Sequence, residues 1–246
     1  MKSIVKSIPN TLTCCNLACG FYASIEGLAS NYELAMYAVF AAAVFDFLDG
    51  LAARLLKAFS PIGKDLDSLA DLISFGVAPG MALFSYLDIL LYEFEWDVFP
   101  AAKLLLLAAF AIPVFSALRL AKFNIDTRQK TSFIGLPVPA HALLWSSLIV
   151  VMSGSCGLES ELLFTEEMGL ASLVSLPVLA VATSLLLVSE IPMFSFKMSS
   201  LAWKDAKTVY IQIAVSAILV AFLGVLGISA SIIFYIILSL ATKKNT

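Results

Sequence analysis

Four aspartates stand close together in an otherwise apolar part of the chain: Asp46, Asp49, Asp67 and Asp71. An ionisable side chain at membrane depth is costly, so a group of them there indicates a functional site. Steps of three and four residues place Asp46 and Asp49 on one helix face and Asp67 and Asp71 on another. Such neighbouring carboxylates repel one another, and one or two divalent cations would remove that cost. Oxygen-only ligands favour a hard cation such as Mg²⁺ or Mn²⁺.

The aspartates belong to a longer pattern that also fixes small and basic residues. It reads Asp46-x-x-Asp49-Gly50-x-x-Ala53-Arg54, eight residues, then Gly63-x-x-x-Asp67-x-x-x-Asp71. Between the two halves, the segment Ser60-Pro61-Ile62-Gly63 is expected to break the helix and let the halves turn toward each other. Two ions held about 3.5–4 Å apart by shared carboxylates can clamp a phosphoryl group and stabilise a leaving phosphate. The pattern therefore indicates phosphoryl transfer on a lipid pyrophosphate whose tail stays in the bilayer.

The composition indicates what positions these residues. Of 246 residues, 61% are hydrophobic and 13% are charged, whereas a soluble domain carries about 25% charged residues. We expect one all-α, polytopic membrane domain over residues 1–246, with core catalytic helices at about 8–189 and two additional C-terminal spans at about 208–242. The eight expected spans lie near residues 8–30, 33–56, 67–92, 100–123, 136–154, 171–189, 208–225 and 227–242. The last two are separated around Gly224 and Gly227, because one continuous helix would be too long for the bilayer core.

The distribution of charge predicts an orientation. With eight spans counted, nearly all basic residues fall on one side, and the other side carries mostly glutamate and aspartate. The basic residues are Lys2, Lys6, Arg54, Lys57, Lys64, Arg119, Lys122, Arg128, Lys130, Lys197, Lys204, Lys207, Lys243 and Lys244. By the positive-inside rule, both termini and the aspartates should be cytoplasmic, with the chain in the inner membrane of the cell. We expect no cleaved signal peptide.

The full pattern resembles the signature of the CDP-alcohol phosphatidyltransferases, and every specified position is matched. The resemblance implies that the substrate is CDP-diacylglycerol, that CMP is released, and that two metal ions take part. It also implies a role for each aspartate. Asp46 and Asp67 would bridge both ions, Asp49 would bind one, and Asp71 would touch the second and accept the proton of the alcohol. A homodimer is implied as well, and no nucleic-acid partner is expected.

The resemblance also implies which residues bind CDP-diacylglycerol: Asn10, Thr13, Gly50, Ala53, Arg54, Ser60 and Gly63. Asn10 and Thr13 belong to a Pro-Asn-x-x-Thr opening, and a plain helix start with polar caps explains them nearly as well. Small residues at Gly50 and Ala53 would let a nucleotide approach the backbone, or simply let helices pack. Arg54 would contact pyrophosphate oxygens or anchor the helix at the membrane surface. Ser60 would contact the nucleotide or cap the following turn.

The flanking sequence is similar to the phosphatidylserine synthase branch of the family, in residues 67–79, 118–124 and 133–140. This similarity covers roughly residues 8–145 and implies L-serine as the acceptor, with phosphatidylserine as the product. Arg119 and Asn124 would contact the serine carboxylate, and Lys122 stands where the branch often has arginine. The alternative for Arg119 and Lys122 is that they are ordinary cytoplasmic anchors.

Two other functions stay open from the sequence. The same fold and mechanism could serve glycerol 3-phosphate or inositol phosphate, because Lys122, Arg128 and Lys130 supply positive charge for a dianionic acceptor. A cation channel or transporter is the alternative of a different class, since intramembrane acids also line ion pathways. Against it, the acids gather at one edge of the membrane, and Gly50 and Gly63 have no role in a simple cation path.

Overall fold

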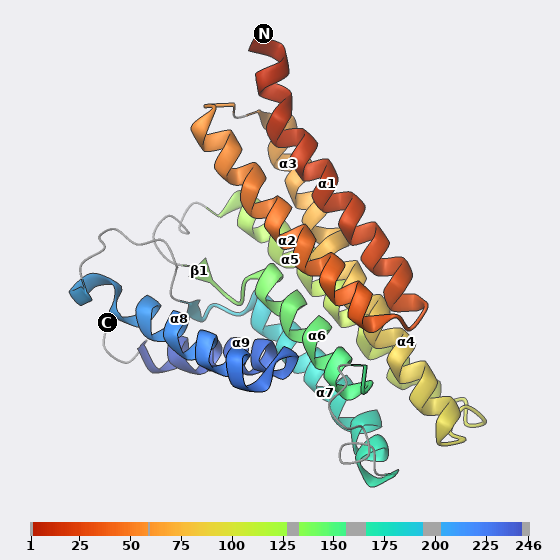
Figure 1. Ribbon diagram of the computed structural model, residues 1–246. Helices are drawn as coiled ribbons and strands as arrows, with labels where there is room; N and C mark the ends of the chain where they lie inside the picture. The colour runs from red at the N-terminus through yellow and green to blue at the C-terminus, as the bar shows by residue number, and fades with distance from the viewer. Residues whose placement is uncertain (1, 59, 127–132, 156–165, 194–202, 243–246) are drawn as a thin grey trace.

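The computed structural model describes residues 2–58, 60–126, 133–155, 166–193 and 203–242, and these form a helical bundle (Figure 1). Its helical elements are α1 (Lys2–Leu28), α2 (Tyr32–Leu55), α3 (Pro61–Asp71), η1 (Leu72–Val77), α4 (Ala78–Glu93), η2 (Ala102–Phe110), α5 (Ala111–Ile125), α6 (Val138–Met152), α7 (Glu166–Val188), α8 (Trp203–Leu223) and α9 (Val225–Thr242). The all-α prediction is confirmed for these residues, apart from one pair of two-residue strands. The basic residues expected at 128, 130, 197, 243 and 244 lie outside them.

Length and apolarity identify part of the bundle as membrane-spanning. Among the described residues, four helices are long and apolar enough to cross a bilayer: Tyr32–Leu55, Ile62–Glu93, Ala102–Ile125 and Gly169–Val188. Shorter apolar helices cover Val138–Met152, Lys207–Leu223 and Val225–Ala241. The helical segments follow the expected spans in order, but this criterion does not select α1, which was expected to be the first span. The chain is thus an integral membrane helical bundle, and the number of eight crossings remains a prediction.

The helix break expected between the two halves of the aspartate pattern is present. Helix α2 ends at Leu55, and α3 begins at Pro61 behind the N-cap residue Ser60. The Ser60 hydroxyl accepts a hydrogen bond from the Gly63 amide at 3.0 Å, which satisfies one of the free N–H groups of the first turn. The chain therefore reverses direction between α2 and α3, so that the two halves of the pattern meet.

A π-helical segment, η1, joins α3 to α4 without a break, and the sequence did not predict it. It begins directly after Asp71. Here α5 approaches closely: a Cβ atom built on Gly76 would lie 3.1 Å from Ser116 Cβ and 3.4 Å from Pro113 Cα. A π-turn takes up one more residue than an α-turn and is frequent at functional sites. It shifts the helix faces beyond Asp71 relative to those before it.

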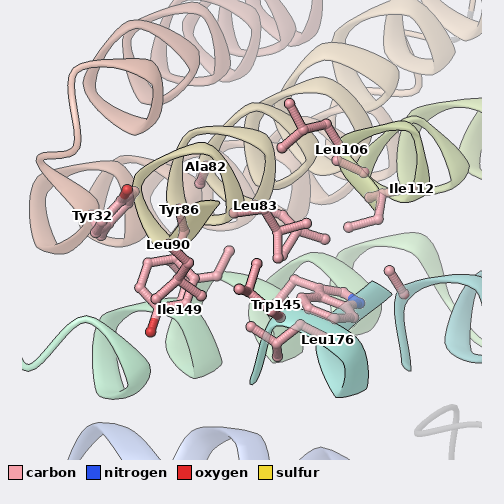
Figure 2. Close-up of a cluster of buried hydrophobic side chains, with 14 of the residues drawn as sticks. Tyr32, Ala82, Leu83, Tyr86, Leu90, Leu106, Ile112, Trp145, Ile149 and Leu176 are labelled. Atoms are coloured by element: carbon pink, nitrogen blue, oxygen red, sulfur yellow. The ribbon is translucent and has the colours of Figure 1, made fainter. Parts of the chain in front are cut away.

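A buried apolar cluster fixes the helices at the end of the bundle away from the aspartates (Figure 2). Tyr32 of α2 packs edge-on against Tyr86 of α4, and Trp145 of α6 lies beneath them, fully buried. The Trp145 Nε1–H lies 3.1 Å from both His141 Nε2 and Thr183 Oγ1, so this buried donor is satisfied between α6 and α7. This cluster makes α2, α4, α6 and α7 a rigid support for the acidic end.

Short strands and a helix pair complete the fold. Strand β1 (Phe133–Ile134) pairs antiparallel with β2 (Pro192–Met193), a contact that the sequence did not predict. Helices α8 and α9 pack together, and Figure 1 shows them running at an angle to α1 and α2. The predicted break between them is confirmed at Gly224, whose φ of +56° is easy only for glycine. A Cβ on Gly227 would lie 2.5 Å from the Leu219 carbonyl carbon, so glycine lets the two helices touch.

Candidate functional site

Three carboxylates from two helices converge at one point. Asp46 and Asp49 come from α2 and Asp67 from α3, and one oxygen of each lies within 4.8 Å of the others. The carboxyl groups of Asp46 and Asp67 are in hydrogen-bonding contact. Asp49 is buried, and the other two are partly buried. The structure therefore brings together acids that are 18 to 21 residues apart along the chain.

This group fits a divalent cation. Oxygen ligands of one Mg²⁺ ion sit at about 2.0–2.1 Å from it, so they lie on the order of 3–4 Å from each other. Small side-chain rotations would bring the three oxygens from their present spacing to that distance. All three donors are carboxylate oxygens, the ligand type that Mg²⁺ and Mn²⁺ prefer. The identity of the ion, and a second ion, remain predictions.

Asp71 lies one turn beyond Asp67 and does not belong to this group of three. Its side chain is 8% exposed, and its Oδ1 accepts a hydrogen bond of 3.1 Å from Asn16 Nδ2 of α1. Helix α1 also contacts the first half of the pattern, because Thr13 Oγ1 donates to Asp49 Oδ2 at 2.5 Å. Thr13 was predicted to bind the nucleotide and here bonds to a carboxylate. Asn16 was not among the predicted site residues.

A cavity of about 200 Å³ opens beside the carboxylates. It is lined by Pro9, Asn10, Thr13, Asp49, Gly50, Ala53, Ala58, Ser60, Gly63, Lys64 and Asp67. All the residues predicted to bind CDP-diacylglycerol line it except Arg54. The exposed Arg54 lies beside it, where its Nε donates to the Gly50 carbonyl at 2.9 Å. The structure thus gathers the N-terminal Pro-Asn-x-x-Thr segment and both halves of the aspartate pattern around one polar cavity.

Sequence reasoning missed several residues of this cavity, chiefly Lys64. The sequence indicates only a membrane side for Lys64, yet Lys64 lines the cavity next to Gly63 and adds a cation there. Its Nζ donates to the Asn124 carbonyl at 2.9 Å, which ties α3 to the end of α5. The signal was its place directly after the first residue of the second half of the pattern. Pro9 and Ala58 carry no chemistry that the sequence could have revealed.

The residues predicted to bind the acceptor alcohol divide between two places. Arg119 and Lys122 line a second, smaller cavity of about 40 Å³, together with two acids, Asp126 and Glu190. Arg119 is 5% exposed, and its Nε donates to the Leu136 carbonyl at 3.2 Å. Asn124 does not line this cavity.

Asn124 turns instead toward α3, on a different side of α5. Its Nδ2 donates to Ser68 Oγ at 2.8 Å, one residue beyond Asp67 in the sequence. Since its carbonyl accepts the hydrogen bond from Lys64, Asn124 connects α5 to the helix that carries the second half of the aspartate pattern. Asn124 is thus placed on the aspartate side, and Arg119 and Lys122 on the side of the small strands.

Comparison with known proteins gives a consistent result. The family model for CDP-alcohol phosphatidyltransferases matches residues 6–166. The chain is 36% identical over 157 residues to a CDP-diacylglycerol–serine O-phosphatidyltransferase of Bacillus subtilis, covering 61% of this chain and 83% of that protein. Proteins of the same name resemble it in Helicobacter pylori (33% over 176 residues, 71% and 69% of the two chains) and Methanocaldococcus jannaschii (33% over 167 residues, 68% and 67%). The residues that the family model matches include the aspartates and the residues lining the cavity.

Proposed function

Because the chain belongs to the CDP-alcohol phosphatidyltransferase family, we propose that it transfers the phosphatidyl group of CDP-diacylglycerol to the hydroxyl of L-serine. The products are phosphatidylserine and CMP. The observation that carries this proposal is the convergence of Asp46, Asp49 and Asp67 on one side of a polar cavity. The curated relatives named for this reaction support serine as the acceptor.

The cavity is the proposed site for the nucleotide and pyrophosphate of CDP-diacylglycerol. Asn10 and Ser60 offer polar atoms, and Gly50 and Ala53 leave room for the ligand to approach the backbone of α2. Among the described residues, the nearest neighbour of a Cβ on Gly50 beyond its own helix backbone would be Arg54 Nη2 at 3.9 Å, which leaves space beside this glycine. Gly63 also lines the cavity, beside Asn10 and Ser60. Arg54 and Lys64, at and near the rim, would pair with pyrophosphate oxygens.

The proposed reaction is a single displacement at phosphorus. The serine hydroxyl oxygen forms a bond to the phosphorus nearest the glycerol, and the bond from that phosphorus to the oxygen bridging to CMP breaks. CMP departs with the electron pair of the broken bond. The hydroxyl proton passes to Asp71, the acid one turn beyond Asp67, which must lie within hydrogen-bond reach of the hydroxyl in the complex.

We further propose that Mg²⁺ or Mn²⁺, as two ions, is required. Asp46, Asp49 and Asp67 would hold them, with Asp71 at the second ion. When bound, such ions neutralise phosphoryl oxygens and stabilise the leaving phosphate. The oxygen-only ligand set beside the cavity supports this choice of metal.

Arg119 and Lys122 are the proposed partners of the carboxylate of the acceptor serine. Asn124, on the side of α5 that contacts α3, is the third residue proposed to bind the acceptor. A guanidinium is suited to a carboxylate because it donates two parallel hydrogen bonds. The acids Asp126 and Glu190 line the same small cavity as the two cations. An amino acid carries both charges, whereas a dianionic phosphate would be repelled by these acids.

The proposed setting is the inner membrane, with the active site and both termini in the cytoplasm, where serine is available. This orientation rests on the one-sided distribution of lysine and arginine. A homodimer is proposed from family membership alone.

The deciding experiment supplies purified protein in detergent with CDP-diacylglycerol, Mg²⁺ or Mn²⁺, and one alcohol at a time: L-serine, glycerol 3-phosphate or inositol phosphate. CMP release and the lipid product are both measured. We expect CMP above background only with serine, together with phosphatidylserine, and none after chelation of the metal. CMP release with another alcohol and none with serine would replace the acceptor in this proposal while keeping the reaction.

A further inference from the structure

Asn16 of α1 is fully buried against the carboxylate that is not part of the group of three. We propose that Asn16 is a positioning residue for the transfer: it holds Asp71 apart from Asp46, Asp49 and Asp67, so that Asp71 serves the acceptor hydroxyl. The inference rests on the proposed function, because it concerns the proton acceptor of that reaction.

The first support is the hydrogen bond itself. Asn16 Nδ2 donates to Asp71 Oδ1 at 3.1 Å, and both side chains are buried. Among the described residues, Asn16 is the side chain that donates a hydrogen bond to Asp71. An amide N–H fixes one carboxylate oxygen in direction and leaves the second oxygen to another partner. Asp71 is thereby oriented by α1 rather than by its acidic neighbours on α2 and α3.

The second support is that Asn16 is itself held in place. Its backbone carbonyl accepts a hydrogen bond of 3.0 Å from Ser74 Oγ. Ser74 lies in η1, the π-helical segment that follows Asp71 directly. A Cβ on Gly20 would lie 2.5 Å from Ser74 Cα, so glycine lets α1 touch this segment one turn beyond Asn16. The π-helical segment thus brings Ser74 against α1 shortly after Asp71 in the chain. The Ser74–Asn16 and Asn16–Asp71 hydrogen bonds together hold Asn16 and Asp71 in position.

The third support is that packing alone does not explain an asparagine at this position. In the described part of the chain, its Oδ1 is buried and has no hydrogen-bond partner. A buried acceptor without a partner is costly, and an apolar side chain of similar size, such as leucine, would avoid that cost. A requirement for the donor group toward Asp71 accounts for the residue.

In the reaction, the pair would act as follows. The acceptor oxygen bonds to phosphorus, the bond to the CMP oxygen breaks, and the hydroxyl proton moves to the Asp71 oxygen that Asn16 does not hold. Asn16 touches neither substrate and acts only through Asp71. Loss of Asn16 should therefore slow turnover without weakening the binding of CDP-diacylglycerol or of the ion held by Asp46, Asp49 and Asp67.

The experiment compares Asn16→Ala and Asn16→Leu with the unmodified full-length protein in detergent. The Leu variant keeps the side-chain volume and removes the donor. Rates are normalised to the amount of folded protein recovered by size-exclusion chromatography. We expect kcat to fall about 100-fold in both variants, because Asp71 would no longer be held in position and a displacement of a reacting group by about 1 Å costs about that much. The KM for CDP-diacylglycerol should stay within about twofold. So should the dissociation constant of the Mn²⁺ ion held by Asp46, Asp49 and Asp67, measured by electron paramagnetic resonance without substrate.

Ser116→Ala is the matched control, because Ser116 is also fully buried beside η1 and its hydroxyl has no hydrogen-bond partner among the described residues. Its kcat should be unchanged. An unchanged kcat in the Asn16 variants would overturn the proposal. So would a parallel loss of Mn²⁺ affinity, which would assign Asn16 to the metal-binding group. If neither variant yields folded protein, Asn16 is a structural residue and the proposal is wrong. If this protein uses an alcohol other than serine, the Asn16 variants are assayed with that alcohol. A failure of the serine assignment is therefore distinguished from a failure of the role proposed for Asn16.

Discussion

Thr13 of α1 donates a hydrogen bond of 2.5 Å to Asp49 of α2, although the two residues are 36 positions apart in the chain. Asn16, three residues further along α1, does the same for Asp71. One face of α1 thus supports one carboxylate from each half of the aspartate pattern. The first helix is therefore part of the acidic site, even though it carries none of its acids.

Replacing Thr13 with valine tests this support. Valine keeps the shape and removes the hydroxyl, so Asp49 loses the side-chain hydrogen bond that Thr13 donates to it. Removing such a partner of a metal ligand typically costs about 10–100-fold in metal affinity or activity. We expect the Mn²⁺ dissociation constant to rise by that factor and CMP release to recover partly at high Mn²⁺. Thr11→Val is the control, because the exposed Thr11 hydroxyl donates to the Ser7 carbonyl of its own helix and, in the described part of the chain, bonds to none of the aspartates. Equal metal affinity in both variants would contradict this role.

The charge of Asp67 can be tested against that of its neighbour Asp65. Asp67→Asn removes one carboxylate of the converging group and leaves the shape nearly unchanged. We expect CMP release to fall by at least about 100-fold, since a direct ligand should matter more than its supporting groups, and extra Mn²⁺ should not restore it. Asp65→Asn changes an exposed acid on the same helix and should retain the activity of the unmodified protein. A similar loss in both variants would mean that general charge, and not metal binding, is responsible.

The sequence predicted the helices and the meeting of the two halves of the pattern because both depend on local signals. Apolar stretches mark the helices, and Ser60 with Pro61 marks the break. The sequence did not predict the π-turn of η1 or the pairing of β1 with β2. Both depend on contacts between distant segments, such as the approach of α5 to Gly76 and the hydrogen bond of 2.9 Å from the Gly135 amide to Ile191.

The candidate site was predictable to a similar extent. The carboxylates and the cavity residues follow a spaced pattern, so their grouping could be inferred. The partners of Asp49 and Asp71 could not, because polar residues on α1 are equally typical of a helix start. The acceptor residues were inferred from nearness in sequence, yet Arg119 and Asn124 lie on different sides of α5. A spacing of five residues already places them on different sides of a helix, since it turns the helix about 140° past a full turn. Which neighbour each side meets depends on how α5 packs against α3, and no local signal sets that.

Gly50 allows a test of whether a ligand approaches α2. Among the described residues outside its own stretch of helix backbone, the nearest atom to a Cβ there is Arg54 Nη2 at 3.9 Å. Alanine also favours a helix over glycine by about 1 kcal/mol. We therefore expect Gly50→Ala to keep or raise the melting temperature while raising the KM for CDP-diacylglycerol about tenfold, because the methyl group takes ligand space. Gly27→Ala should show the opposite pattern, since its Cβ would lie 3.1 Å from Ala82 Cβ, away from the cavity. An unchanged KM in Gly50→Ala would place the nucleotide elsewhere.

Lys122 tests the acceptor site with little risk to folding, because it is exposed and, within the described part of the chain, its ammonium makes one long hydrogen bond, of 3.5 Å, to the Val188 carbonyl. A hydrogen bond to a charged group contributes about 1.5–3 kcal/mol, which corresponds to roughly 10–100-fold in affinity. We expect Lys122→Ala to raise the KM for serine by at least about tenfold and to leave the KM for CDP-diacylglycerol unchanged. Lys57→Ala, at another exposed lysine on the same predicted side, should change neither constant. If Lys122→Ala raised both constants equally, Lys122 would act through general surface charge, and the acceptor pocket would have to be sought beside Asn124 and α3.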